Sequence, residues 1–151
     1  MQISVKHIIA DEELKKAFNI RRNVFVIEQQ VPENEEYDEF ESSSRHFLAI
    51  ADGIPCGTAR WRFTDKGIKM ERFAVLADFR GKQVGTALVA AVLEDIRQHP
   101  ESKGKTRYLH AQLSAMPLYA KFGFRAEGEM FSECDIWHYK MVLPPNQNEA
   151  K

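Results

Sequence analysis

Residues 80–87 constrain the fold of this chain more than any other segment. They read Arg-Gly-Lys-Gln-Val-Gly-Thr-Ala and join a strand-like run over residues 70–76 to an amphipathic helical pattern over residues 83–98. The first turn of a helix has free backbone N–H groups and the positive end of the helix dipole. This turn, flanked by Arg80 and Lys82, therefore predicts a site for a phosphate group. Its two glycines would also suit a tight turn and close helix packing without any ligand.

The size and composition of the chain favour one compact domain. The sequence has 151 residues, 44% of them hydrophobic, and no linker-like break longer than a turn. A net charge of −1 gives no general attraction to nucleic acid or to anionic membranes, so a small-molecule or peptide substrate is favoured. Cys56 and Cys134 lack metal-ligand spacing, which predicts packing thiols and no metal. The N-terminal residues lack a long apolar segment, which predicts a cytoplasmic protein. A homodimer is left open.

Hydrophobic periodicity predicts alternating strands and helices. Residues 3–8 alternate like a half-buried strand, and helical spacing follows from an N-cap at Asp11 to Phe25. Residues 30–44 are acidic and favour a mobile loop or a weakly held helix, either a lid over the substrate or a solvated face. A short helix capped by Ser114 is also expected. Further strands are expected at residues 47–51, 56–63, 68–76, 107–113, 126–131 and 136–143.

These elements predict an α/β fold in a single domain over residues 1–143, followed by a polar tail over residues 144–151. Because hairpins and helical connections both occur, the twisted sheet should be mixed and mostly antiparallel, with helices on both faces. The strand at residues 68–76 should lie at its centre. Ligands in such sheets gather at the carboxyl ends of central strands, which places a pocket beside residues 73–75.

Three segments occur in an order that resembles one protein family. They are Glu-Arg-Phe-Ala-Val at residues 71–75, the turn at residues 80–85, and Leu-Tyr-Ala-Lys-Phe-Gly-Phe at residues 118–124. Together they resemble the GNAT superfamily of acyl-CoA-dependent N-acyltransferases, and Gly-Glu-Met-Phe at residues 128–131 is similar to its small, ElaA-like bacterial branch. The resemblance implies the acyl-CoA N-acyltransferase fold and transfer of an acetyl group from acetyl-CoA to a primary amine by direct attack in a ternary complex.

The resemblance also assigns residues to the acetyl-CoA site. The backbone of Phe73, Ala74 and Val75 is expected to pair with the pantetheine arm, and the turn that follows is expected to wrap the pyrophosphate. That turn comprises Arg80, Gly81, Lys82, Gln83, Val84, Gly85 and Thr86. Gln83 stands where the family usually has glycine, so its side chain must point away from the phosphate. Gln112 stands where the family has asparagine, and its amide can still donate and accept hydrogen bonds.

The general acid is expected to be Tyr119, which matches the family residue that protonates the departing CoA thiolate. An amine is mostly protonated at neutral pH, so a base must remove a proton before the nitrogen attacks. Glu71 is the first candidate, because strict strand alternation places it on the face that carries Phe73. His110 and His138 on neighbouring strands are alternatives, since imidazoles titrate near neutral pH. A backbone N–H of the central strand is expected to stabilise the oxyanion.

Two other hypotheses stay open at this point. Arg22, residues 35–39 and residues 71–73 are also similar to acyl-homoserine-lactone synthases, which use S-adenosylmethionine and an acyl carrier. The chain could instead be a non-catalytic CoA-binding or regulatory module, although the presence of Tyr119 disfavours that. The acceptor has no motif of its own, and the acidic residues at 30–44 favour a cationic amine.

Overall fold

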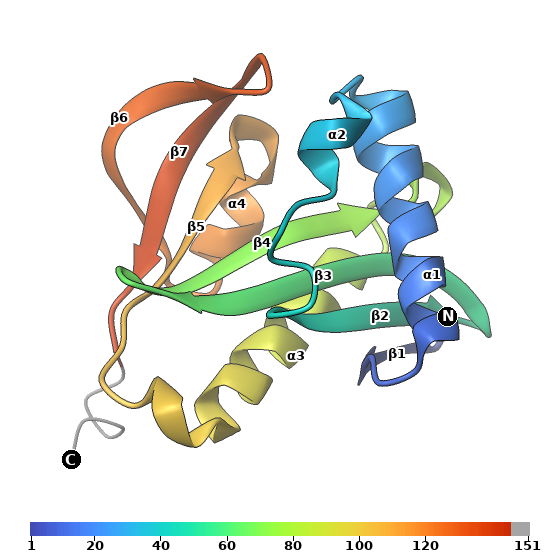
Figure 1. Ribbon diagram of the computed structural model, residues 1–151, viewed down its shortest axis with the longest axis horizontal. Helices are drawn as coiled ribbons and strands as arrows, with labels where there is room; N and C mark the ends of the chain where they lie inside the picture. The colour runs from blue at the N-terminus through green and yellow to red at the C-terminus, as the bar shows by residue number, and fades with distance from the viewer. Residues whose placement is uncertain (146–151) are drawn as a thin grey trace.

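The structure is a computed structural model that describes residues 1–145, so residues 146–151 of the expected polar tail lie outside the described part. The described residues form one seven-stranded sheet in the order β1-β2-β3-β4-β5-β7-β6 (Figure 1). Its strands are β1 (Ile3–His7), β2 (Arg45–Ala51), β3 (Ile54–Thr64), β4 (Gly67–Val75), β5 (Arg107–Gln112), β6 (Arg125–Glu133) and β7 (Ile136–Leu143). The β4–β5 pair is parallel and the other pairs are antiparallel, which confirms a mixed, mostly antiparallel sheet with β4 at its centre.

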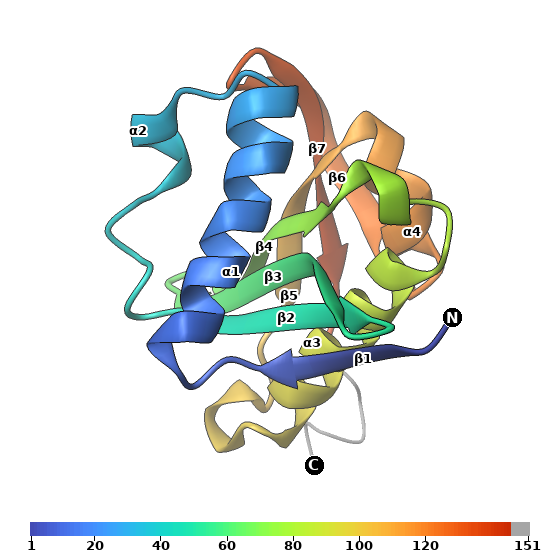
Figure 2. The same cartoon turned by 90° about the vertical axis from the view of Figure 1, so that its right-hand side faces the viewer.

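Helices cover both faces of the sheet, as predicted (Figure 2). The helices are α1 (Asp11–Arg21), α2 (Glu33–Glu36), α3 (Val84–Gln98) and α4 (Met116–Ala120). The first predicted helix differs in two details, because Asp11 is its first helical residue after an N-cap at Ala10, and a π-helical segment (Arg22–Glu28) continues it. Ser114 does not cap α4, since it lies in a 3₁₀ turn (Leu113–Ala115) that precedes the helix. None of the helices in the described part combines the length and apolar character that crossing a membrane requires.

Two apolar clusters hold the layers together. On one face, Val84, Leu88 and Val92 of α3 pack against the strands around Trp61 and Met70, all of them fully or almost fully buried. Each such side chain contributes about 1.5–3 kcal/mol to folding when it is buried completely. On the other face, a smaller cluster joins α1 to the sheet. Its members are Ala17, Ile20, Val24, Phe25, Val31, Leu48 and Ala74.

The central strands separate toward the carboxyl end of β4. Pairing between β4 and β5 is limited to Ile68 with Arg107 and Lys69 with Tyr108, and the two strands diverge beyond these residues (Figure 1). β4 also contains a bulge, because Arg72 has a φ of 59° and the pairing with β3 shifts register there. The divergence leaves the backbone of β4 without a neighbour on its β5 side and opens the sheet where a ligand was expected.

Candidate active site

Two cavities open where β4 and β5 separate, and Phe73, Ala115 and Tyr119 line both. We call the first the loop groove; it has a volume of about 420 Å³ and lies between β4, the turn after it and α4. We call the second the sheet pocket; it has a volume of about 190 Å³ and lies between the diverging strands. A molecule lying in the loop groove can therefore reach a second molecule in the sheet pocket beside Tyr119.

The loop groove contains most of the residues expected to bind acetyl-CoA. Its lining residues are Phe73, Val75, Phe79, Arg80, Gly81, Gln83, Val84, Gly85, Thr86, Leu88, Ser114, Ala115, Leu118, Tyr119 and Lys121. Three expected side chains do not line it. Ala74 is buried in the cluster under α1, Lys82 is exposed beside the groove, and Gln112 lines the sheet pocket instead. The expectation for Ala74 concerned its backbone, which remains part of the strand beside the groove.

The first turn of α3 supplies the free donors of the groove. The first hydrogen bond within the helix runs from Ala87 N to Gln83 O at 3.1 Å, and no side chain within residues 1–145 caps the N-terminus of the helix. The N–H groups before Ala87 are therefore available to an anion. Gln83 has a φ of 71°, a left-handed conformation that favours the glycine found in the resembling family. A Cβ added at Gly85 would lie 3.2 Å from Leu118 Cδ2, so glycine there permits the close approach of α4.

Arg80 is already ion-paired in this structure. Its guanidinium lies 2.5 and 2.8 Å from the carboxylate oxygens of Glu28, and its Nε donates to Val75 O at 2.9 Å. The hydrogen bonds with Glu28 raise the pKa of Arg80. Glu28 therefore neutralises the cation that was expected to face a phosphate. Sequence reasoning missed Glu28, because 52 residues separate the pair and no spacing rule links them.

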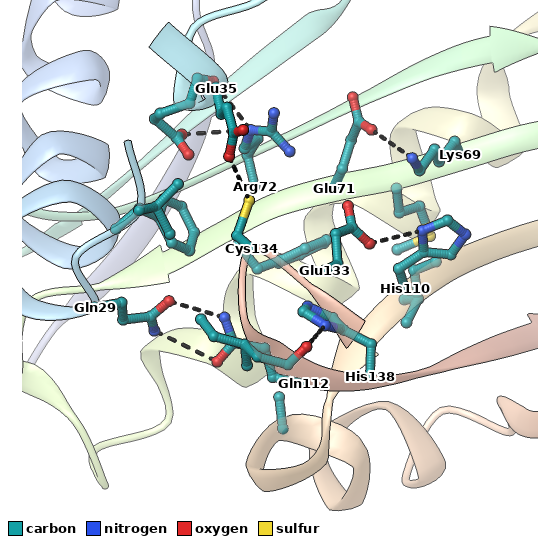
Figure 3. A pocket seen from close by; sticks show the side chains of 18 of the residues that line it. Gln29, Glu35, Lys69, Glu71, Arg72, His110, Gln112, Glu133, Cys134 and His138 are labelled. Atoms are coloured by element: carbon teal, nitrogen blue, oxygen red, sulfur yellow. Dashed lines mark hydrogen bonds and ion pairs between the residues drawn. The ribbon is translucent and has the colours of Figure 1, made fainter. Parts of the chain in front are cut away.

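The sheet pocket is built from side chains of widely separated segments (Figure 3). Its lining residues are Phe25, Gln29, Val31, Glu35, Glu36, Lys69, Met70, Glu71, Arg72, Phe73, Leu109, His110, Gln112, Ala115, Tyr119, Glu133, Cys134, Ile136 and His138. The structure thus brings together Tyr119 and the three residues considered as bases. Among residues 1–145, no cluster of three or more His, Cys, Asp or Glu side chains could hold a metal ion.

Glu71 lies on the opposite face of β4 from Phe73 and Val75, so the expectation of a shared face is wrong. The bulge at Arg72 adds one residue to β4 and reverses the alternation. Phe73 and Val75 pack against the α3 cluster, whereas Glu71 meets Arg60 on the α1 face.

The environment of Glu71 also makes it a weak base. Its Oε2 accepts from Arg60 Nε at 2.7 Å and from Arg62 Nε at 2.9 Å, and Lys69 Nζ lies 3.3 Å from Oε1. Burial raises the pKa of this carboxyl, but the three cations outweigh burial and lower it to about 2. A carboxylate with so little affinity for a proton is poorly suited to deprotonate an ammonium.

His138 has the geometry of a base. Its side chain is 8% exposed, stacks on Phe131 and places Nδ1 2.7 Å from Ile136 O. A carbonyl oxygen only accepts, so Nδ1 carries a proton, and in the neutral ring the lone pair is on Nε2. Nε2 has no hydrogen-bond partner among residues 1–145.

His110 is engaged differently, because its Nδ1 lies 3.2 Å from Glu133 Oε2. This hydrogen bond lowers the pKa of Glu133. Glu133 is the last residue of β6, and sequence reasoning did not identify it. The pair places at the wall of the sheet pocket one carboxylate that makes no ion pair with an arginine or lysine of residues 1–145.

Tyr119 lies at the junction of the two cavities. It is 6% exposed, and its ring meets Phe73 and Phe124 edge-on with centroids 5.6 and 6.1 Å apart. Burial raises the pKa of its phenol, so the hydroxyl stays protonated at neutral pH. The hydroxyl makes no hydrogen bond with the residues that the structure describes, which leaves its proton available to a ligand.

Two contacts connect the N-terminal half of the chain to the far wall of the pocket. Gln112 Nε2 donates to Gln29 Oε1 at 2.9 Å, so the amide expected to contact acetyl-CoA already has a partner. Cys134 Sγ lies 3.2 Å from Glu35 Oε2 at the tip of the β6–β7 hairpin. Burial and Glu35 raise the pKa of this thiol to about 11. Cys56 is buried as expected, but Cys134 is exposed and lines the pocket.

The acidic segment over residues 30–44 is not weakly held. Arg21 Nε lies 2.7 Å from Glu36, and Arg60 lies 2.7 Å from Asp38 and 2.8 Å from Glu41. Both arginines are almost completely buried. These carboxylates neutralise arginines of the protein itself, so they give no support to a cationic acceptor.

Comparison with known proteins agrees with this geometry. The chain matches the acetyltransferase (GNAT) domain family over residues 7–144. It belongs to the GNAT acetyltransferase family. It is 39% identical to YjcF of Bacillus subtilis, an uncharacterised N-acetyltransferase, over 91% of this chain and 99% of that protein. The protein is therefore an acyltransferase of the GNAT type, a class that acts on amine acceptors.

Solved structures support the same fold. Escherichia coli ElaA is 25% identical, with a TM-score of 0.78 over 93% of this chain and 99% of ElaA, which confirms the resemblance to the ElaA-like branch. A GNAT acetyltransferase of Elizabethkingia anophelis, solved with acetyl-CoA bound, is 17% identical with a TM-score of 0.67. That alignment covers 93% of this chain and 94% of the other, and it shows the likeness of the fold.

Proposed function

We propose that this GNAT protein transfers an acetyl group from acetyl-CoA to a primary amine by direct attack in a ternary complex. The observation that carries the proposal is the meeting of two cavities at Tyr119. One cavity has free backbone donors for a phosphate, and the other has the free Nε2 of His138. A donor and an acceptor held in these cavities would meet beside a protonated phenol.

Acetyl-CoA would lie in the loop groove. Its pyrophosphate would accept hydrogen bonds from the first turn of α3, with Arg80 beside it. Its pantetheine amides would pair with the backbone of residues 73–75, since β4 has no strand neighbour there on its β5 side. The acetyl thioester would then lie near Phe73 and Tyr119, where the two cavities join.

The transfer needs one base and one acid. His138 Nε2 takes a proton from the ammonium, and the neutral nitrogen attacks the thioester carbonyl. A backbone N–H of residues 73–75 stabilises the oxyanion. The carbon–sulfur bond breaks as the intermediate collapses, and Tyr119 gives its proton to the sulfur of CoA. The nitrogen loses its second proton to solvent, which yields the neutral amide, and solvent returns a proton to the phenolate of Tyr119. Among the three bases considered, His138 replaces Glu71 as our first choice, because its lone pair is free and Glu71 is occupied by cations.

Calorimetric CoA binding and acetyl-CoA-dependent thiol release test this function. We expect CoA to bind and to raise the melting temperature, and amines to stimulate thiol release. Gly85→Glu, which puts bulk and negative charge at the first turn of α3, should abolish CoA binding, whereas Ala90→Glu on the exposed face of the same helix should not. Thermal unfolding of both variants verifies folding.

Three results would contradict the proposal. Absence of CoA binding at millimolar concentration would remove the donor site. CoA binding without thiol release for any amine would favour a regulatory module. Acylation that requires S-adenosylmethionine and an acyl carrier would favour an acyl-homoserine-lactone synthase.

A further inference from the structure

A third hollow, which we call the basic pocket, adjoins the sheet pocket. It has a volume of about 290 Å³ and shares Lys69 and His110 with the sheet pocket. Its cationic lining residues are Arg62, Lys66, Lys69 and Lys140. The side chain of Tyr108, which is 6% exposed, forms part of its wall. The shared residues make the two pockets neighbours along one face of β4, β5 and β7.

Positive charge in the basic pocket exceeds the nearby negative charge. Arg62 and Lys69 both contact Glu71, and the same carboxylate also binds Arg60. Lys66 makes no ion pair with the residues that the structure describes.

The remaining cation of the basic pocket has one exposed partner. Lys140 Nζ lies 3.3 Å from Glu127, whose side chain is 56% exposed. Asp65 is the one carboxylate among the described lining residues. The four cations of the basic pocket therefore have three carboxylates near them. Asp65 lines the pocket, Glu71 is shared with Arg60, and Glu127 is exposed. The resulting positive excess favours binding of an added anion.

The sheet pocket has the opposite excess. Glu133 is paired with His110 and Glu35 with the thiol of Cys134, and within residues 1–145 neither makes an ion pair with an arginine or lysine. The hydrogen bond with His110 lowers the pKa of the Glu133 carboxyl, and the charge of Lys69 contributes to this lowering. An ammonium near His138 would therefore also lie near carboxylates that are not held in an arginine or lysine ion pair. The acidic sheet pocket suits the amine of an acceptor, and the adjoining basic pocket suits an acidic group on the same molecule.

The strand register sets the distance between these ends. Gln112 pairs with His138, and His110 pairs with Lys140. His138 and Lys140 are two residues apart on β7, so they share a face at a separation of about 7 Å. An acceptor whose amine and second group lie about 7 Å apart would match this spacing of the two backbone positions.

We propose that the acceptor is a primary amine that also carries an acidic group, a refinement that rests on the proposed acetyltransferase function. The amine lies in the sheet pocket beside His138 and Glu133. The acidic group lies in the basic pocket, between Lys66 and Lys140. A second cation at that end of the acceptor would meet the lysines and be disfavoured.

The test compares three acceptors of equal length with the full chain and acetyl-CoA. They are ε-aminocaproate, its neutral amide ε-aminocaproamide, and the dication hexamethylenediamine, each assayed by thiol release. We expect kcat/KM for ε-aminocaproate to exceed that for the amide by about tenfold, and that for the diamine by more. An aminoalkyl phosphate of the same length shows which acid is preferred, and a preference for either acid over the amide supports the proposal.

Charge reversal locates the contact. Lys66→Glu and Lys140→Glu should each lower the ratio of kcat/KM for ε-aminocaproate to that for the amide by about three- to tenfold. Lys16→Glu, the same change on the exposed face of α1, should leave the ratio as in the wild type. Equal kcat/KM for the acceptors, a preference for the diamine, or an unchanged ratio in both pocket variants would overturn the inference and leave the acetyltransferase function intact. Failure of every acceptor to stimulate thiol release would overturn the function, and the inference with it.

Discussion

The loop groove and the sheet pocket meet at Tyr119 but are built from different parts of the chain. Most of the groove comes from one stretch, the end of β4 followed by the first turn of α3, and its donors are backbone N–H groups. The sheet pocket is lined by side chains from α2, β4, β5, β6, β7 and the turn between β6 and β7. A local segment therefore creates the first site, whereas the second exists only after the whole sheet has formed.

This difference separates general from specific recognition. Backbone donors recognise phosphate and amide groups and tolerate a change of side chain, as Gln83 shows by taking the left-handed conformation expected for glycine. The sheet pocket depends on the charge and orientation of individual side chains such as Glu133 and His138. Substitutions should therefore affect CoA binding through the groove and acceptor chemistry through the pocket.

The largest effect should come from Tyr119, which lines both cavities. Tyr119→Phe removes the proton for the leaving thiolate, so kcat should fall by about 10²–10⁴-fold, with little change in KM for acetyl-CoA. Steady-state thiol release measures both constants. Tyr139→Phe removes a hydroxyl from a neighbouring strand outside the cavities and serves as the control. An unaltered kcat in Tyr119→Phe would make Tyr119 a packing residue.

The next largest effect should come from the base of the sheet pocket. His138→Gln should lower kcat/KM by about 10²-fold and flatten the acidic limb of its pH profile, with CoA affinity nearly unchanged. Calorimetry of CoA binding separates the two effects. If His110→Gln or Glu71→Gln flattens the acidic limb of the pH profile while His138→Gln leaves that limb unchanged, our choice of base is wrong. If none of the three variants changes the limb, the amine loses its proton to water.

Glu71 tests whether a residue in the pocket wall can be purely structural. Its pKa is lowered from 4.5 to about 2 by Arg60, Arg62 and Lys69, so its ionised form stabilises the folded state above pH 4.5. This contribution, about 3 kcal/mol, is lost as the pH falls from 4.5 toward 2. In urea unfolding, Glu71→Gln should have a lower free energy of unfolding than the wild type at pH 7, and the difference should be smaller at pH 4. Equal stability of variant and wild type at pH 7 would contradict the ion-pair account, and Glu33→Gln in an exposed pair is the control.

The contrast between the two cavities also explains what the sequence could predict. Strand and helix periodicity predicted the mixed sheet, its centre at β4 and the groove at the turn, because these depend on local patterns. The face of Glu71 was predicted wrongly, because the bulge at Arg72 leaves no signature in the alternation of apolar residues. Glu133 and Gln29 were missed, since each acquires its role from a partner that is distant in sequence.

The smallest effect should come from Glu28, which neutralises Arg80 beside the groove. Glu28→Gln removes a negative charge near the expected pyrophosphate and frees the guanidinium, so CoA should bind about two- to fivefold more tightly at low salt. The gain is small because the pair is exposed, with about two-fifths of each side chain accessible (42%). Calorimetry at two salt concentrations measures it, and the gain should shrink at high salt. Glu94→Gln, which breaks the exposed pair with Arg97 near the far end of α3, should leave CoA binding unchanged. Weaker CoA binding in Glu28→Gln would mean that Glu28 positions Arg80 for the phosphate instead of competing with it, and the groove would then depend on a long-range side-chain contact as the sheet pocket does.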